Sequence, residues 1–331
     1  PARQEKMIVA EQYAWLSSLQ RFGIKLGLEQ VAELLAAVGD PHRRLRFVHL
    51  AGTNGKGSIG ALLAAGFSYA GLRTGFYTSP HLIEVRERFR MDGRAIAEKP
   101  LAKLIACLRP AAERMAAAGR CPTYFEVTTV LAALHFAESG ADLVIWETGM
   151  GGRHDATNVV MPVVSVITGI GMDHCAHLGA TEAAIAGEKA GIIKAGVPVF
   201  RGAMSAEAAA VIDAVASQRG APLQVIEDAS VQLSGKADGR RRVAWRGHEF
   251  EISLPGAMQL RNAALAAAVA RHLAPGFGRS PEVVLSGFAR ARWPGRRQRL
   301  PDGTLLDGAH NPPAIADLAA ELAAEFPGER F

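Results

Sequence analysis

The sequence predicts an α/β fold built around a mainly parallel sheet. Short runs of β-branched and apolar residues alternate along the chain with alanine-rich stretches of helical length. This is the pattern of strands joined by crossover helices. A glycine-rich turn follows one of the apolar runs and leads directly into a stretch of helical length. A chain of 331 residues is too long for one small domain core, so we expect two domains.

The expected elements follow one another in a regular order. The expected strands are Arg46–Gly52, Thr74–Ser79, Asp142–Thr148, Val163–Thr168, Val197–Phe200 and Thr304–Leu306. The expected helices are Ser58–Ala70, Glu98–Ala118, Thr123–Ser139, Glu182–Ile193 and Gln259–His272. Residues Arg241–Leu254 alternate more than they cluster and predict a peripheral hairpin. The composition shifts near Trp293, so we place a domain boundary between residues 1–292 and 293–331.

Composition and charge narrow the classes of function. Hydrophobic residues make up 49% and charged residues 21% of the chain, which is normal for a globular enzyme. The N-terminal stretch is charged and is no secretory signal, and no apolar run approaches the length of a membrane span. Three cysteines without CxxC spacing indicate neither disulfides nor zinc. We therefore expect a cytoplasmic protein without a membrane partner.

The net charge of +5 and the isoelectric point of 9.3 fit anionic partners. The one dense basic run, Arg290–Arg299, has a single aromatic residue and no interleaved stacking pattern, so we expect no nucleic-acid partner. Small anionic substrates are the other explanation. The chain begins with Pro1 and stops at Phe331 soon after a new motif, so we expect a fragment of a longer protein.

The strongest local motif lies between the strand Arg46–Gly52 and the helix that follows it. It reads Gly52-Thr53-Asn54-Gly55-Lys56-Gly57-Ser58. Glycines permit backbone conformations that turn successive N–H groups toward phosphate oxygens, and the helix N-terminus adds positive charge. Lys56 would reach the β- and γ-phosphates of a bound nucleotide, and the Ser58 hydroxyl would lie near the metal ion that accompanies them. The motif departs from a strict Walker A sequence because Leu50 stands where its first glycine should be.

Further polar groups follow the other expected strands, where open α/β sheets bind ligands. Glu147 lies at the end of the expected strand Asp142–Thr148 and precedes a glycine-rich loop with Arg153, His154 and Asp155. An acidic residue there commonly holds Mg²⁺, although a solvated strand end is the alternative. The next loop contains Asp173 and His174, and a lone histidine is more often structural.

Two more segments carry candidate residues. Lys189 lies on an expected helix, where a lysine is normally a solvated surface group. Asp307-Gly308-Ala309-His310-Asn311-Pro312 opens a helix, with Asn311 as an expected N-cap and Pro312 at the first helical position. Arg296 precedes that segment and could contact a bound phosphate.

Taken in order, these segments resemble the folylpolyglutamate synthase and dihydrofolate synthase family within the Mur ligase superfamily. The resemblance spans about residues 20–315. It rests on the motifs HLAGTNGKGS, TSPHL, TYFEVTT, ETGMGGRHDATN, ITGIGMDH, GEKAGIIK, LPGAMQLRNAALA, WPGR and LDGAHNP. It implies a Mur-ligase-type P-loop ATPase domain with a mainly parallel sheet, followed by the start of a truncated, Rossmann-like glutamate-ligase domain.

The resemblance also implies a role for each matching position. ATP would be bound by Gly52, Thr53, Asn54, Gly55, Lys56, Gly57, Ser58, Asn262, Arg296 and Asp307. Mg²⁺, at two sites, would be held by Ser79, Glu147, His174 and Lys189, with Lys189 carbamylated. The catalytic residues would be Lys56, Lys189 and His310. The pterin substrate would contact Lys25, Leu26, Gly27, Thr123, Tyr124, Phe125, Glu126, His154, Asp155 and Ala156.

The implied activity is ATP-dependent addition of L-glutamate to a folate, and to dihydropteroate in bifunctional members, by a monomer. Lys25 stands where bifunctional members often have an acidic residue, and His154 replaces a usual leucine. A Mur-type ligase for muramyl peptides shares the loop, but TSPHL and GGRHDATN favour the folate branch. A GTPase switch would need an NKxD motif, which the sequence lacks. A truncated form that binds nucleotide without turnover is the remaining alternative.

Overall fold

The structure is a computed structural model that describes residues 2–23, 27–226, 231–237 and 240–328. Its centre is an eight-stranded sheet in the order β4-β3-β2-β5-β1-β6-β7-β8. The strands are β1 (Phe47–Ala51), β2 (Thr74–Tyr77), β3 (Phe89–Met91), β4 (Arg94–Ala95), β5 (Leu143–Glu147), β6 (Val164–Ile167), β7 (Val199–Arg201) and β8 (Leu223–Val225). β3 pairs antiparallel with β2 and with β4, and the other strand pairs described in this sheet are parallel, so the expected mainly parallel α/β fold is confirmed.

The central strands end together at one edge of the sheet. β1 pairs with β5 on one side and with β6 on the other, with Leu50 opposite Glu147 and Ala51 opposite Ile167. The segments that follow these strands therefore start side by side. In a parallel sheet this carboxyl edge is where ligands bind.

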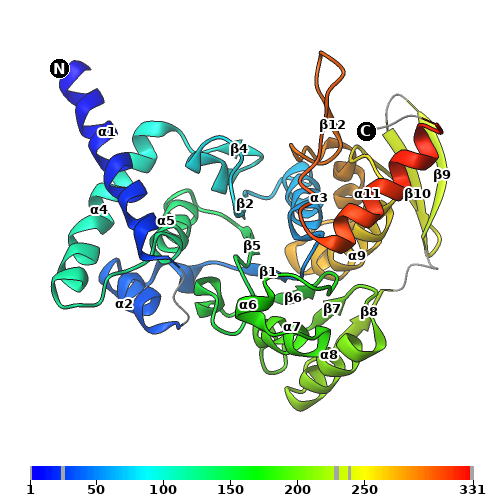
Figure 1. Cartoon of the computed structure of the whole chain (residues 1–331), viewed down its shortest axis with the longest axis horizontal. Coiled ribbons are helices and arrows are strands. Elements are labelled where there is room, and N and C mark those ends of the chain that lie inside the picture. The colour runs from blue at the N-terminus through cyan, green and yellow to red at the C-terminus, as the bar shows by residue number, and fades with distance from the viewer. Residues whose placement is uncertain (1, 24–26, 227–230, 238–239, 329–331) are drawn as a thin grey trace.

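Helices cover both faces of the sheet (Figure 1). They are α1 (Ala2–Ser18), α2 (Glu29–Ala37), α3 (Lys56–Tyr69), α4 (Glu98–Ala117), α5 (Tyr124–Glu138), α6 (Cys175–Leu178), α7 (Glu182–Lys189), α8 (Ala206–Gln218), α9 (Met258–Leu273), α10 (Pro281–Ser286) and α11 (Pro312–Glu325). Successive strand residues point to opposite faces. Val48 and Leu50 of β1 join the core with α3 and α9, whereas Phe47 joins the core with α4 and α5.

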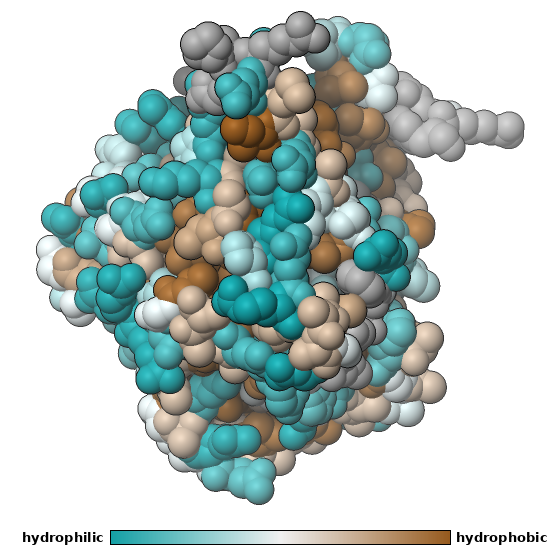
Figure 2. All heavy atoms as spheres, turned by 90° about the vertical axis from the view of Figure 1, so that its left-hand side faces the viewer, coloured by the Kyte–Doolittle hydropathy of each residue, from teal (hydrophilic) through white to brown (hydrophobic). Residues whose placement is uncertain are grey.

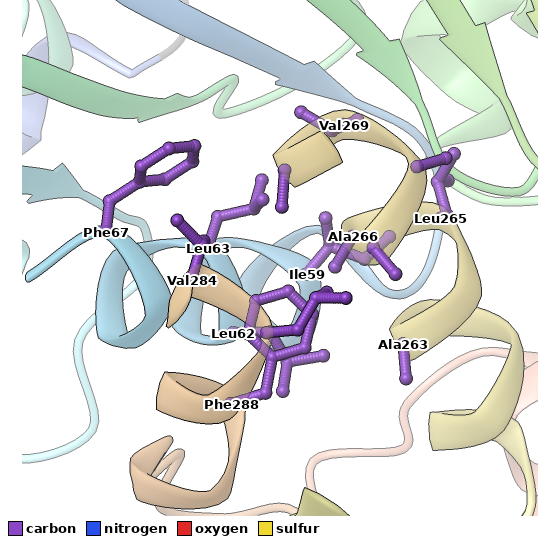
Figure 3. Close-up of a cluster of buried hydrophobic side chains, with 14 of the residues drawn as sticks. Ile59, Leu62, Leu63, Phe67, Ala263, Leu265, Ala266, Val269, Val284 and Phe288 are labelled. Atoms are coloured by element: carbon purple, nitrogen blue, oxygen red, sulfur yellow. The ribbon is translucent and has the colours of Figure 1, made fainter. Parts of the chain in front are cut away.

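Small residues let neighbouring segments approach α3 closely in this core. Ile59, Leu62 and Phe67 of α3 meet the alanine-rich helix α9 and the helix α10 (Figure 3). A Cβ atom on Gly287 would lie only 2.7 Å from the Cα atom of Gly66. The high alanine and glycine content therefore lets α3, which begins at the phosphate-loop motif, sit deep in the molecule.

Residues Arg241–Leu254 form the expected hairpin, with strands β10 (Arg240–Trp245) and β11 (His248–Ile252), and β10 pairs with β9 (Val231–Ala237). This sheet lies outside the eight-stranded sheet, at the edge of the molecule (Figure 1). One of its faces, including Val243 and Phe250, is buried in the core with α3.

The helix expected at Glu182–Ile193 ends earlier, at Lys189, and continues as the 3₁₀ turn Ala190–Ile192. Gly191 packs there against the backbone of Arg153, where a Cβ atom would lie 2.3 Å from the Cα atom of Arg153. This close approach of another segment explains the tighter turn.

The last segment carries a short hairpin, β12 (Gln298–Arg299) and β13 (Leu305–Leu306), and then α11. Asn311 is the N-cap of α11, and its Oδ1 atom accepts a hydrogen bond from the N–H of Ala314 at 3.1 Å, as expected. The division into residues 1–292 and 293–331 stays a prediction. Among the described residues, no helix is long and apolar enough to cross a bilayer. The face covered by α1 and α4 mixes hydrophilic and hydrophobic residues (Figure 2).

Adjacent residues of α10 provide a test of the core around α3. Val284 is fully buried, whereas Val283 is 44% exposed. We predict that Val284→Ala lowers the free energy of unfolding by about 2 kcal/mol, since it removes buried methyl groups and leaves a cavity. Val283→Ala, the matched control, should change it by less than about 0.5 kcal/mol. Denaturant unfolding measures both, and equal losses would contradict this packing.

Candidate functional site

The glycine-rich loop lies at the carboxyl edge of the sheet, between β1 and α3. Gly52 and Gly55 have φ angles of 148° and 91°, in the region that favours glycine. A Cβ atom on Gly52 would lie 1.8 Å from the Thr168 Oγ1 atom, and one on Gly55 would lie 2.6 Å from the Asn262 Oδ1 atom. Both glycines are therefore required by the backbone conformation and by close neighbours.

The loop is held in place by the segment that follows β6. The Thr53 N–H donates to the Gly169 carbonyl at 2.7 Å, and the Thr53 hydroxyl donates to the Gly171 carbonyl at 3.0 Å. The Thr168 hydroxyl donates to the Asn54 carbonyl at 2.5 Å. These bonds fix the loop at Thr53 and Asn54, so these two expected ATP contacts also have a structural role.

Lys56 begins α3 and is half-buried. Its Nζ atom donates to the Gly52 carbonyl at 2.8 Å and to the Thr53 carbonyl at 3.3 Å. Burial lowers the pKa of Lys56, and the charge of Glu147 partly offsets that effect. The ammonium group therefore sits inside the loop, where it can neutralise an anionic ligand.

Lys189, at the end of α7, is a second lysine at the same carbonyl. It is 3% exposed, and its Nζ atom donates to the Gly52 carbonyl at 2.9 Å. Burial, together with the charge of Lys56, lowers the pKa of Lys189 to about 7. The surface lysine that the helix position suggested is thus a buried amine beside the phosphate loop.

Glu147 ends β5 opposite Leu50 and is 4% exposed. The Thr78 hydroxyl donates to its carboxylate at 2.5 Å, and the backbone N–H of Ser79 also donates to it. Burial raises the pKa of Glu147, while the charge of Lys56 lowers it. Two expected metal ligands, Ser79 and Glu147, are thereby in contact beside the loop.

The donor set fits Mg²⁺ that is bound together with phosphate. Mg²⁺ usually takes one or two carboxylates and fills its other positions with phosphate oxygens and water. Glu147 offers a buried carboxylate of this kind. No group of three or more His, Cys, Asp or Glu side chains that could hold a metal occurs within the part of the chain that the structure describes. Protein side chains alone therefore do not make a closed metal site there.

His174 and His310 both lie near Asp173. Their Nε2 atoms are 3.9 Å and 4.0 Å, respectively, from the Asp173 Oδ2 atom. His174 has a φ angle of 50° as the N-cap of α6, and the Nδ1 atom of His310 lies 2.7 Å from the Gly308 carbonyl. Both side chains are exposed. The structure brings the two histidines to one acidic residue.

Asn311 ties the last segment to the phosphate loop. Its side-chain amide exchanges hydrogen bonds with that of Asn54, at 3.0 and 3.1 Å, across 257 positions of sequence. The Asn311 Nδ2 atom also donates to Asp173 at 3.1 Å. The helix cap expected at Asn311 is therefore also the contact that joins α11 to the loop.

The remaining residues expected to bind ATP border the same region. Asn262 of α9 is buried and donates to the Gln259 Oε1 atom at 3.0 Å. Asp307 accepts from the N–H groups of Arg297 and Ala309, at 2.8 Å each, so its carboxylate also shapes a turn.

Cavities surround the loop on two sides. One is lined by residues that include Thr53, Gly55, Asn262, Leu265 and Pro313. Another is lined by residues that include Ser79, Glu147, Trp293, Arg296 and His310.

The residues expected to contact the pterin lie along the start of α5 and the loop after β5. Thr123 and Glu126 are buried and form a capping box: the Glu126 carboxylate accepts from the Thr123 N–H at 2.7 Å, and the Thr123 hydroxyl accepts from the Glu126 N–H at 3.2 Å. Tyr124 lies under the Arg88 guanidinium, 5.3 Å from its ring centroid, and a Cβ atom on Gly149 would lie 2.5 Å from Phe125.

Of the other pterin candidates, Asp155 is buried and its carboxylate accepts from the Met150 N–H at 2.8 Å. Ala156 is buried and His154 is exposed. Gly27 has a φ angle of 142°. Lys25 and Leu26 lie outside the described residues.

The sequence reasoning missed several side chains that build the site. Thr78, Thr168 and Gln259 were not singled out, although each hydrogen-bonds a predicted site residue or its loop. A threonine just past a buried strand is a weak signal that could have indicated the first two. Gln259 stands three residues before Asn262 on the expected helix, and this spacing could have indicated the contact.

The fold and the loop define a P-loop α/β ATPase domain. Residues 50–270 match the Mur ligase middle domain family. The chain is 38% identical to the dihydrofolate synthase/folylpolyglutamate synthase of Bacillus subtilis, covering 96% of this chain and 77% of that one. It is 35% identical to the folylpolyglutamate synthase of Lacticaseibacillus casei, with the same two coverages.

Solved structures agree with these matches. A folylpolyglutamate synthase (FPGS)–AMPPCP–folate complex superposes with a TM-score of 0.87 at 34% identity, covering 96% of this chain and 81% of that one. The Mycobacterium tuberculosis folylpolyglutamate synthase complexed with ADP and AMPPCP superposes with a TM-score of 0.86 at 32% identity, covering 97% of this chain and 75% of that one. The chain belongs to the folylpolyglutamate synthase/dihydrofolate synthase family of ATP-dependent ligases.

The buried amine of Lys189 predicts a pH dependence of stability. Its pKa of about 7 in the folded chain lies below the ordinary value of 10.5. Between these values the unfolded chain binds more protons, so this lysine makes the free energy of unfolding rise with pH. We predict that, in buffer free of CO₂, wild-type protein gains stability from pH 7 to pH 10.5 relative to Lys189→Met. Denaturant unfolding at several pH values measures this, and parallel curves would contradict it.

Proposed function

We propose that this chain joins the amino group of L-glutamate to a carboxylate of a folate, with ATP supplying the energy through an acyl phosphate. The observation that carries the proposal is the phosphate loop with Lys56 inside it and the buried carboxylate of Glu147 beside it. The family supports it, and one relative is described as a complex with AMPPCP and folate.

An acyl phosphate solves the chemical difficulty of this reaction. A carboxylate is a poor acyl donor because oxide is a very poor leaving group. Transfer of the γ-phosphoryl group of ATP to a carboxylate oxygen forms an acyl phosphate and ADP. The glutamate amine then attacks the carbonyl carbon and expels phosphate, and its proton is lost to a base or to water. The products are an amide, ADP and phosphate.

The chain's own groups would stabilise the charge on the transferring phosphoryl group. Lys56 and the N–H groups of the loop would contact the β- and γ-phosphates, and Arg296 would approach from the cavity that it shares with Glu147. Mg²⁺ held by Glu147 and Ser79 would neutralise phosphate charge. Asn262 would border the nucleotide from the cavity on the other side of the loop. His310, in the cavity of Arg296 and Glu147, and Asp307, which lines a pocket with Arg296, would also border it. A second metal site at His174 is part of the same proposal.

Lys189 would serve as a carbamate. Its pKa of about 7 leaves much of the amine neutral near neutral pH, and a neutral amine adds to CO₂ with loss of one proton. The product is a carboxylate-like group on nitrogen. It would replace one of two cations at the Gly52 carbonyl with an anion that can accept hydrogen bonds or bind a metal.

The acceptor and the assembly are finer points of the proposal. Dihydropteroate is the second candidate acceptor, and the position of Lys25 argues against it. The start of α5, with Tyr124 and Phe125, would contact the pterin. A muramyl-peptide acceptor is disfavoured because the relatives reported above carry folate-ligase names. A monomer and a cytoplasmic location stay predictions.

The direct test is phosphate release with ATP, glutamate and one acceptor at a time. We predict release with tetrahydrofolate, none with muramyl nucleotide, and at least about 10²-fold less with Lys56→Ala, because a charge-stabilising group is lost. The matched control is Lys103→Ala, which changes an exposed lysine of α4 and should retain full activity. Release with muramyl nucleotide alone would refute the folate assignment. Nucleotide binding without any release would favour the form without turnover.

The carbamate has its own test. We predict that Lys189→Ala loses most turnover and regains part of it when a short carboxylic acid is added, since the acid can supply the missing carboxylate. Wild-type protein should also lose activity when bicarbonate is removed, whereas Lys189→Ala should not respond. Full activity of Lys189→Ala at low bicarbonate would rule the carbamate out.

A further inference from the structure

Trp293 lies against the first turn of the helix that carries the phosphate loop. A Cβ atom on Gly57, the second residue of α3, would lie 2.6 Å from the Trp293 Nε1 atom and 2.8 Å from its Cε2 and Cζ2 atoms. The two residues are far apart in sequence. The indole therefore occupies the space that a side chain at position 57 would need.

Gly57 is a glycine because of this neighbour rather than because of its backbone. Its φ angle is outside the positive range that favours glycine, and it lies within the α-helix Lys56–Tyr69. Alanine would suit that helical position better on its own. The three atoms nearest to the added Cβ atom all belong to the Trp293 ring.

The indole is also held from its other sides. Its ring centroid lies 5.3 Å from that of Phe76 in β2, and the Arg90 guanidinium lies 6.0 Å from it. Phe76 in turn occupies the space above Gly60, where a Cβ atom would lie 2.4 Å from the Phe76 Cζ atom. Gly57 and Gly60 share one face of α3, three residues apart. The two aromatic rings thus fill successive gaps on that face.

Arg296 follows Trp293 by three residues and enters the cavity beside the loop. It lines this cavity together with Gly57, Glu147 and Trp293, and its charge acts on both Lys56 and Glu147.

The turn between Trp293 and Arg296 is also held by a hydrogen bond and a close contact to Gly308. The Gly308 N–H donates to the Gly295 carbonyl at 2.8 Å, and a Cβ atom on Gly308 would lie 3.0 Å from the Arg296 Nη1 atom. With Trp293 anchored on α3, Arg296 has little freedom to leave the loop.

We propose that Trp293 is a positioning residue, whose indole docks on Gly57 and thereby places the Arg296 guanidinium against the terminal phosphate of a nucleoside triphosphate. The inference deepens the proposed function and rests on it only for turnover. The binding of a triphosphate to the loop can be measured without any acceptor.

The test compares variants by calorimetric affinity for a non-hydrolysable ATP analogue. Arg296→Ala should lose about tenfold in affinity, the scale of one charge-assisted contact. Trp293→Ala should show a similar loss because Arg296 is no longer held. Gly57→Ala should show it too, because the added methyl group displaces the indole.

The double variants decide between positioning and independent effects. Gly57→Ala/Trp293→Ala and Trp293→Ala/Arg296→Ala should each lose no more than about the tenfold of their single variants, since all act through one guanidinium. Losses that multiply to about a hundredfold would overturn the proposal, as would normal affinity in Trp293→Ala. In both cases the indole would not act through Arg296.

Two controls separate a specific loss of affinity from misfolding of the variant. Trp15→Ala, in α1 and outside the site, should bind the analogue as wild type does and should not change the loss caused by Gly57→Ala. ADP affinity should be nearly unchanged in Trp293→Ala, whereas a misfolded chain would lose ADP as well. If Trp293→Ala fails to fold by thermal unfolding, Trp293→Leu replaces it with the same expected result. Triphosphate binding without phosphate release would refute the proposed function and leave this inference testable.

Discussion

The site depends on positive charge that is buried at the end of β1. The ammonium groups of Lys56, which is half-buried, and Lys189, which is buried, both donate to the Gly52 carbonyl. Burial lowers the pKa of each amine. Burying a charged group without a full partner is costly. An anion in the loop would supply that partner, and the proposed phosphate group or carbamate would each be such an anion.

The fold supplies the position for this charge. Glycines at 52 and 55 let the chain turn sharply after β1, and small residues along α3, α9 and α10 let the helix that follows lie deep in the core. The sheet then brings Glu147 beside the loop from the next strand. The later segment reaches back through Asn311 and Trp293, so residues far along the chain complete the surroundings of the loop.

Much of this could be predicted because it is local. The strand–glycine–helix pattern predicted β1, the turn after it and α3, and the N-cap at Asn311 followed from residue type and position. The buried state of Lys189 could not be predicted from its helix, because only the tertiary packing of α7 places it beside Gly52. The burial of the β10–β11 hairpin was missed for the same reason: alternation predicts one apolar face, but it does not say what that face meets.

A crystal structure with a non-hydrolysable ATP analogue and Mg²⁺ tests the central claim most directly. The account predicts terminal phosphates within the loop of residues 52–58, in contact with the Lys56 ammonium, and a metal ion bridging them to the Glu147 carboxylate. A structure in which Lys56 still binds only the Gly52 and Thr53 carbonyls, while the nucleotide lies elsewhere, would contradict it.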